Sequence, residues 1–234
     1  MSLSALPILS PVEARVLGVL VEKQRTVPDT YPLSLNAIVA GCNQKTSREP
    51  IMSVSDADAQ AAIDTLKHRS LVVESSGGRV MRYAHNAERV LGLPSQSVAL
   101  LAVLMLRGPQ TAGELRINCD RLHRFADISA VEGFLRELEV WSAGALVVEL
   151  PRAPGTRETR WAHLLAGPPA AELMIAAPAG VSGGGDSIAP SSEVAMLRDA
   201  VAALQQEVAS LRAELARLAD DVRATAAREP PPSA

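Results

Sequence analysis

The chain has 234 residues, of which 47% are hydrophobic and 21% are charged, so it can build hydrophobic cores and is not disordered by composition. The net charge of −3 and an aromatic content of 3% argue against nucleic-acid binding by bulk positive charge or by base stacking. The longest apolar run, residues 98–106, is shorter than the roughly 20 residues of a membrane span. There is no secretory signal pattern, and two widely spaced cysteines suit a reducing compartment, so we expect a cytoplasmic protein without a membrane segment.

The first predicted unit, residues 1–90, begins with three helices. Residues 10–13, SPVE, form a capping box with proline at the first helical position, which predicts a helix start. A second helix follows Ser34, and the spacing of apolar residues predicts a third helix over residues 55–69. A short extra strand near residues 26–33 is also compatible with the pattern.

An internal duplication is the most informative feature of the sequence. Residues 71–74, LVVE, recur as residues 146–149, and residues 82–85, RYAH, recur in the form RWAH as residues 160–163. The connection between the two motifs is three residues longer in the second copy. In each copy the motifs flank a loop rich in glycine, serine or proline, which predicts two strands of a β-hairpin. The chain is therefore predicted to contain two similar units.

The second predicted unit, residues 91–165, repeats the same order of elements. Its three helices are predicted over about residues 97–107, 111–119 and 128–141, and TAGE at 111–114 is another capping box. Three helices followed by a two-stranded hairpin are typical of the winged-helix plan, a helix-turn-helix with a β wing. The predicted fold class is α+β, mostly α, with two tandem winged-helix domains.

The C-terminal third has a different character. Residues 166–192 are rich in Ala, Gly, Pro and Ser and are predicted to be a flexible linker, and residues 228–234 are predicted to be a disordered tail. Between them, residues 193–227 carry a heptad pattern that predicts a parallel two-stranded coiled coil and therefore a homodimer. A trimer or a single amphipathic helix that packs on the domains remains an alternative. The predicted dimerisation residues are Val194, Leu197, Val201, Leu204, Val208, Leu211, Leu215, Leu218 and Val222.

The sequence offers little for catalysis. Its four histidines show no metal-ligand spacing, and no nucleophile-elbow, phosphate-loop or dinucleotide motif is present. His85 and His163 are repeat equivalents at a predicted strand end, where packing or capping explains them better than metal binding. We expect a protein that is not an enzyme and that uses no cofactor or metal.

Positive charge is concentrated in the predicted turn and wings. In a winged helix the third helix enters the major groove and the wing contacts the backbone, but both third helices here are rich in acidic residues. Arg116, Arg121 and Arg124 form a further basic cluster in the second unit. A solvated surface role is the alternative for each of these cations taken singly. The candidate DNA-binding residues are Asn43, Gln44, Lys45, Ser47, Arg48, Arg79, Arg82, Arg152, Arg157 and Arg160.

Three segments resemble a known bacterial family. Residues 31–50, YPLSLNAIVAGCNQKTSREP, are similar to a signature of the YceH family, as are residues 107–116, RGPQTAGELR, and residues 160–165, RWAHLL, where tyrosine is more usual at 161. The resemblance covers about residues 9–165. It implies tandem winged-helix domains in a cytoplasmic protein, and it supplies neither a mechanism nor catalytic residues.

Two functional hypotheses follow. The leading one is a dimeric protein of transcription-regulator type that binds double-stranded DNA, because the fold, the basic turn and wings and the dimerising helix agree with it. The alternative is a protein–protein interaction adaptor that uses the winged-helix fold without DNA contact. The acidic third helices and the near-neutral charge of the first two thirds of the chain favour this alternative.

Overall fold

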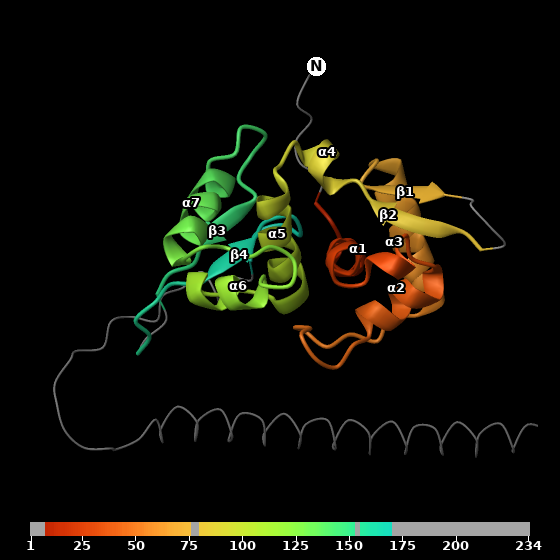
Figure 1. Ribbon diagram of the computed structural model, residues 1–234, viewed down its shortest axis with the longest axis horizontal. Helices are drawn as coiled ribbons and strands as arrows, with labels where there is room; N and C mark the ends of the chain where they lie inside the picture. Colours follow the sequence, from red (N-terminus) through yellow and green to blue (C-terminus); the bar gives the residue numbers. More distant parts are fainter. Residues whose placement is uncertain (1–7, 76–79, 153–154, 170–234) are drawn as a thin grey trace, which may run out of the picture. The chain divides into compact units, whose positions relative to one another are not determined.

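The computed structural model describes residues 8–75, 80–152 and 155–169, which all belong to one compact unit (Figure 1). This part is an α+β structure, mostly helical, with two small antiparallel strand pairs, as the sequence predicts. The predicted coiled coil (193–227), the tail and most of the predicted linker lie outside the described residues. In chain order the elements are α1 (Pro11–Thr26), η1 (Pro28–Thr30), α2 (Leu35–Cys42), α3 (Asp56–His68), β1 (Val72–Ser75), β2 (Arg82–His85), α4 (Ala87–Leu91), α5 (Ser95–Arg107), α6 (Ala112–Asn118), α7 (Ile128–Glu139), β3 (Val147–Glu149) and β4 (Trp161–His163).

Side-chain caps start the helices where the sequence predicts them. The hydroxyl of Ser10 accepts a hydrogen bond from the amide of Glu13, whose carboxylate accepts one from the amide of Ser10 at 2.9 Å. Thr111 and Glu114 form the same reciprocal pair at the start of α6. Each pair satisfies two amide groups that a helix start leaves without partners, so these starts are fixed locally.

Four details differ from the sequence prediction. Helix α5 begins at Ser95, two residues earlier than predicted, and α7 ends at Glu139, two residues earlier. The short helix α4 was not predicted, because five residues show too little periodicity to be recognised. It ends at Gly92, whose φ of 67° is a left-handed conformation that glycine adopts without strain. The predicted unit boundary at residue 90 falls inside α4.

The duplicated motifs form the two hairpins. Strands β1 and β2 pair with Val72 opposite His85, and β3 and β4 pair with Val147 opposite His163, so the equivalent residues occupy the same register. An isolated bridge from the segment before the second helix extends each hairpin on the same side: Leu33 pairs with Tyr83 in the first repeat, and residue 110 with residue 161 in the second. The bridge at Leu33 is the only pairing within the described residues that corresponds to the extra strand considered near residues 26–33.

Helices α1 and α5 lie side by side at the centre and join the repeats into one core (Figure 1). Residues 13–21 of α1 and residues 97–106 of α5 are all buried, since each helix is covered by its own repeat and by the other helix. The helices approach closely at Gly18, where an added Cβ would lie 3.0 Å from Cγ of Leu106. The amide of Glu49 also donates to the carbonyl of Leu106 at 2.8 Å.

The third helices lie on the outer sides of this pair. Helix α3 packs on α1, α2 and β1, and α7 packs on α5, α6 and β3 (Figure 1). Each third helix therefore keeps an outward face in solvent next to its own hairpin. The two cysteines, Cys42 and Cys119, close the second helices of the two repeats and are buried free thiols.

Candidate nucleic-acid interface

The polar loop between α2 and α3 is a predicted DNA contact, but several of its side chains form hydrogen bonds with other groups of the protein. The side chain of Asn43 donates to the carbonyl of Val54 at 2.9 Å and accepts from the amide of Val54 at 2.7 Å. The hydroxyl of Ser47 accepts from Arg107 at 2.7 Å. Lys45 is exposed and has no hydrogen-bond or ion-pair partner within the described residues. Of these three predicted contacts, Lys45 alone has no hydrogen-bond or ion-pair partner within the described residues.

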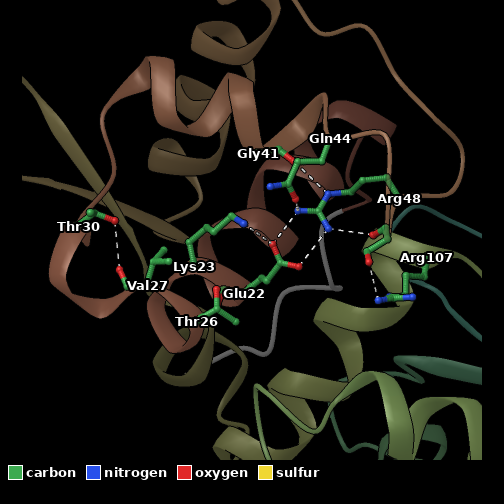
Figure 2. A network of polar contacts seen from close by, with 10 residues as sticks. Glu22, Lys23, Thr26, Val27, Thr30, Gly41, Gln44, Arg48 and Arg107 are labelled. Atoms are coloured by element: carbon green, nitrogen blue, oxygen red, sulfur yellow. Dashed lines mark hydrogen bonds and ion pairs between the residues drawn. The ribbon is translucent and has the colours of Figure 1, made fainter.

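Arg48 has a structural role in place of the predicted DNA contact (Figure 2). It is 4% exposed, and its Nε donates to the carbonyl of Gly41 at 3.0 Å. Its two Nη atoms donate to the carboxylate of Glu22, at 2.7 and 3.1 Å, to the carbonyl of Ser47 and to the side-chain oxygen of Gln44. All five guanidinium N–H groups therefore have an acceptor, and none is free for a phosphate.

The ion pair with Arg48 also determines the charge state of Glu22. Burial by itself raises the pKa of the Glu22 carboxyl, but the hydrogen bond and the positive charge of Arg48 outweigh it, and the net pKa is lowered. Glu22 thus stays ionised and holds the loop against α1. Gln44, another predicted DNA contact, serves the same network through its bond to Arg48.

A second buried arginine, which the sequence analysis did not single out, supports the same loop. Arg15 is 1% exposed and donates to the carbonyls of Cys42, at 3.3 Å, and Pro50, at 2.6 Å. Burial, together with the neighbouring charge of Arg48, lowers the pKa of the Arg15 guanidinium. In the sequence of α1, Arg15 lies among apolar residues. This interruption of an apolar segment was the only feature of the sequence that could have indicated a buried arginine.

The arginines that begin the second strands are repeat equivalents with equivalent bonds. Arg82 donates to the carbonyl of Pro32 at 2.8 Å, and Arg160 donates to the carbonyl of Pro109 at 2.8 Å. Arg160 also donates to the carboxylate of Glu114 at 3.0 Å. Both arginines tie a hairpin to the segment before the second helix, although their side chains remain partly in solvent. Two more of the predicted DNA contacts therefore form hydrogen bonds within the protein.

The glutamate of the repeated LVVE motif pairs with the third helix in each repeat. In the first repeat Glu74 pairs with Lys67 of α3. In the second, Glu149 accepts from Arg136 of α7 at 2.5 Å, and the guanidinium of Arg136 lies 4.7 Å from the ring centre of Trp161. The main cations on the third helices are thus paired with hairpin carboxylates, which weakens their attraction for phosphate.

Several free cations lie in the second repeat. Arg121, Arg152 and Arg157 are exposed and have no hydrogen-bond or ion-pair partner within the described residues. Arg124 forms an ion pair with Asp120, but both side chains are largely exposed to solvent. Arg116 makes one hydrogen bond, to a backbone carbonyl. These arginines come from α6, the turn between α6 and α7, and the hairpin loop, which are the elements that flank α7. Arg79, the remaining predicted contact, lies outside the described residues.

An open groove of about 500 Å³ lies between α7, the start of α6 and the second hairpin. It contains two free arginines, the paired Arg136 and three carboxylates, and two glycines of α6 and α7 lie along it. The lining residues are Ala112, Gly113, Ile128, Glu132, Gly133, Arg136, Glu149, Arg152, Arg157, Glu158, Thr159 and Trp161.

Burial keeps both cysteines and the two repeat-equivalent histidines in their neutral forms. Burial raises the pKa of the Cys42 thiol to about 11 and that of Cys119 to about 12, so both thiols stay protonated. Burial also lowers the pKa of His85 and His163 to about 4, which keeps both imidazoles neutral. Within residues 8–75, 80–152 and 155–169, no three His, Cys, Asp or Glu side chains lie together as metal ligands. Over the same residues no helix is both long and apolar enough to span a membrane.

Fold and site together define a duplicated, mostly helical α+β protein whose second repeat exposes arginines around a groove. The model of a family described as a protein of unknown function, DUF480, matches residues 9–156. A UPF0502 protein of Burkholderia vietnamiensis is 60% identical over 206 residues, which cover 86% of each chain. A UPF0502 protein of Dechloromonas aromatica is 59% identical over 198 residues, which cover 85% of this chain and 93% of the relative.

The chain therefore belongs to the DUF480/UPF0502 family of uncharacterised bacterial proteins. At this level the resemblance found in the sequence is confirmed.

Proposed function

We propose that the described part of the chain is a tandem winged-helix module, as the YceH resemblance implies. Each repeat has three helices and then an antiparallel hairpin, and the third helix packs beside that hairpin. The isolated bridges of Leu33 to Tyr83 and of Gln110 to Trp161 pair the segment between the first and second helices with the hairpin, at the place where a winged helix carries a short third strand. These features support a winged helix in both repeats.

The module binds double-stranded DNA through its second repeat and acts without enzymatic activity, in the manner of a transcription regulator. The observation that carries this proposal is the set of exposed arginines on the elements that flank α7, the helix that would enter the major groove. Free arginines are the donors that fix a protein on phosphates. In the first repeat Arg48 and Arg82 bond within the protein and Lys45 is a free cation, so we expect the first repeat to contribute less to DNA affinity.

The protein functions as a homodimer in the cytoplasm. The heptad residues from Val194 to Val222 support a parallel coiled coil, which would present two second repeats to one duplex. Half-sites one helical turn apart, about 34 Å, or a multiple of that distance fit such a dimer. Sedimentation of the full chain tests this: loss of the dimer in Leu204→Asp plus Leu211→Asp supports the coiled coil, and an unchanged mass contradicts it.

The direct test of DNA binding is a fluorescence-anisotropy titration of the full chain with a random-sequence duplex at several salt concentrations. We expect affinity that falls with salt. In Arg152→Glu plus Arg157→Glu, the salt slope should decrease by about 0.9 for each phosphate that the variant no longer neutralises. The charge-matched control is Arg25→Glu plus Arg89→Glu in the first repeat and α4, where we expect little change. A wild-type protein that shows no salt-dependent binding contradicts the proposal.

A protein-interaction adaptor is the second candidate, and the outward face of α3 favours it. Asp56, Asp58 and Asp64 make that face acidic, and a phosphate backbone would be repelled there. A photo-crosslinking residue at Ala61, in the middle of the exposed face, tests this candidate in nuclease-treated lysate. A specific protein adduct at Ala61, absent when the same residue replaces Arg89, supports an adaptor. Equal labelling at both positions argues against one.

A further inference from the structure

Gly133 in the middle of α7 is a glycine that the fold does not require. Glycine destabilises a helix interior relative to alanine, so such a residue needs a reason. A Cβ added at Gly133 would have no atom within 4 Å, and its φ lies outside the positive range. By contrast, a Cβ at Gly18 would lie 3.0 Å from Leu106, and one at Gly41 would lie 2.6 Å from Val19. Gly18 and Gly41 allow neighbouring helices to pack closely. At Gly133 no other part of the described chain packs against the glycine.

The place that Gly133 opens onto is the groove of about 500 Å³ between α7 and the second hairpin. Gly113 of α6 lines the same groove, and a Cβ there would make only ordinary contacts, at 3.8 Å or more. The backbone is thus accessible from the groove at two points. A molecule that must come close to the protein main chain gains space from both glycines.

The rim of the groove supplies donors. Arg152 and Arg157 of the hairpin loop line it and have no hydrogen-bond or ion-pair partner within the described residues, although the charge of Arg152 acts on Glu149. Arg136 is held by Glu149 over the ring of Trp161. The apolar side chains of the groove are Ala112, Ile128 and Trp161, and of these only Ile128, which is 45% exposed, presents much surface to solvent.

From this arrangement we propose that the groove seats one sugar-phosphate strand of a DNA duplex, with Gly133 at the point of closest approach. Arg152 and Arg157 bind the phosphates of that strand. The proposal rests on DNA binding by the second repeat and adds which surface holds the backbone. Glu132 and Glu158 also line the groove and repel phosphate, so they limit the affinity.

The experiment compares Gly133→Gln with Ala61→Gln in the full chain. Ala61 is the equivalent exposed position of α3, where no strand is expected to bind. Glutamine is a good helix former, so we expect Gly133→Gln to raise the thermal midpoint. We expect its affinity for a random-sequence duplex to fall by about tenfold or more, the scale on which one good hydrogen-bonded pair with DNA acts. Ala61→Gln should bind like the wild type.

The outcomes separate this inference from the proposed function. If the wild type does not bind the duplex, the proposed function fails and this inference fails with it. If the wild type binds and Gly133→Gln binds equally well, DNA binding stands and the groove proposal is overturned. If Gly133→Gln loses affinity for poly-glutamate but not for the duplex, the groove binds acidic peptide, and the proposal is overturned as well. Stronger duplex binding by Glu132→Gln plus Glu158→Gln, without a change in the midpoint, supports the proposal.

Discussion

The two repeats share one frame but use their arginines differently. In the first repeat Arg15 and Arg48 are buried, and they fix the loop between α2 and α3 to α1. In the second repeat the loop between α6 and α7 receives one bond from an exposed arginine, Arg116 to the carbonyl of Ala126 at 3.1 Å, and Arg121 in it is exposed to solvent. A basic loop in a sequence can therefore be bonded inside the protein in one copy of a fold and be exposed to solvent in the other.

The largest expected difference between the repeats comes from removing Glu22. Glu22→Ala leaves Arg48 buried without a carboxylate, and we expect a loss of about 3–5 kcal/mol in the free energy of unfolding. Glu149→Ala in the second repeat breaks a pair with an exposed arginine, so its effect should be much smaller. Urea denaturation of the full chain measures both. Equal losses would show that the clamp is not special to the first repeat.

A pH titration sharpens the comparison, because both repeats bury an equivalent histidine. Burial lowers the pKa of His85 and His163 to about 4, with a smaller contribution from Arg25 for His85, whereas an unfolded chain titrates near 6.5. Between these values the unfolded chain binds more protons than the folded one. The contribution of these two histidines to stability is therefore complete above pH 6.5, falls as the pH drops toward 4, and levels off below it, where carboxyls with a lowered pKa, such as Glu22, continue the loss.

The slope of that loss is about 1.4 kcal/mol per pH unit for each histidine. Urea denaturation at several pH values measures it. We expect His163→Gln to remove about half of the slope, since His85 would then be the only contributor of the pair. His68→Gln, at an exposed position of α3, is the control. A slope that His163→Gln leaves unchanged would contradict the assigned burial.

The smallest of these effects concerns the close approach of α1 and α2. A Cβ in Gly41→Ala would lie 2.6 Å from Cγ1 of Val19, a stiff β-branched side chain, so we expect overpacking to cost about 1–3 kcal/mol. The matching position at the end of α6 is Asn118, where Asn118→Ala adds no atoms and removes only a partly buried hydrogen bond to Gln110, so it should cost less. Thermal unfolding of the two variants decides whether this close approach distinguishes the repeats.

Local patterns predicted most of the fold. The capping boxes at Ser10 and Thr111 and the duplicated hairpin motifs act over a few residues, and the structure confirms them. The 97–106 stretch reads as an apolar helix in the sequence, but its burial on all sides follows from packing against α1, far away in the chain. Periodicity carries no information about that partner.

The candidate site was harder to predict for the same reason. Whether Arg48 is free depends on Glu22, which lies 26 residues earlier on another helix. Arg152 and Arg157 of the second hairpin have no hydrogen-bond or ion-pair partner within the described residues, and their predicted contact with DNA stays a prediction. Gly133 gave no signal in the sequence, because only the packing shows that a side chain would fit there.

Because α1 packs against α5 at Gly18, neither repeat buries the apolar surface of its first helix by itself. Cut apart, each would expose an apolar stripe along its first helix, and such a fragment would aggregate. A single-repeat ancestor with the same stripe would have needed a second copy of itself to cover it. Duplication within one chain would have made that pairing permanent, and it would have freed the two outer faces to diverge.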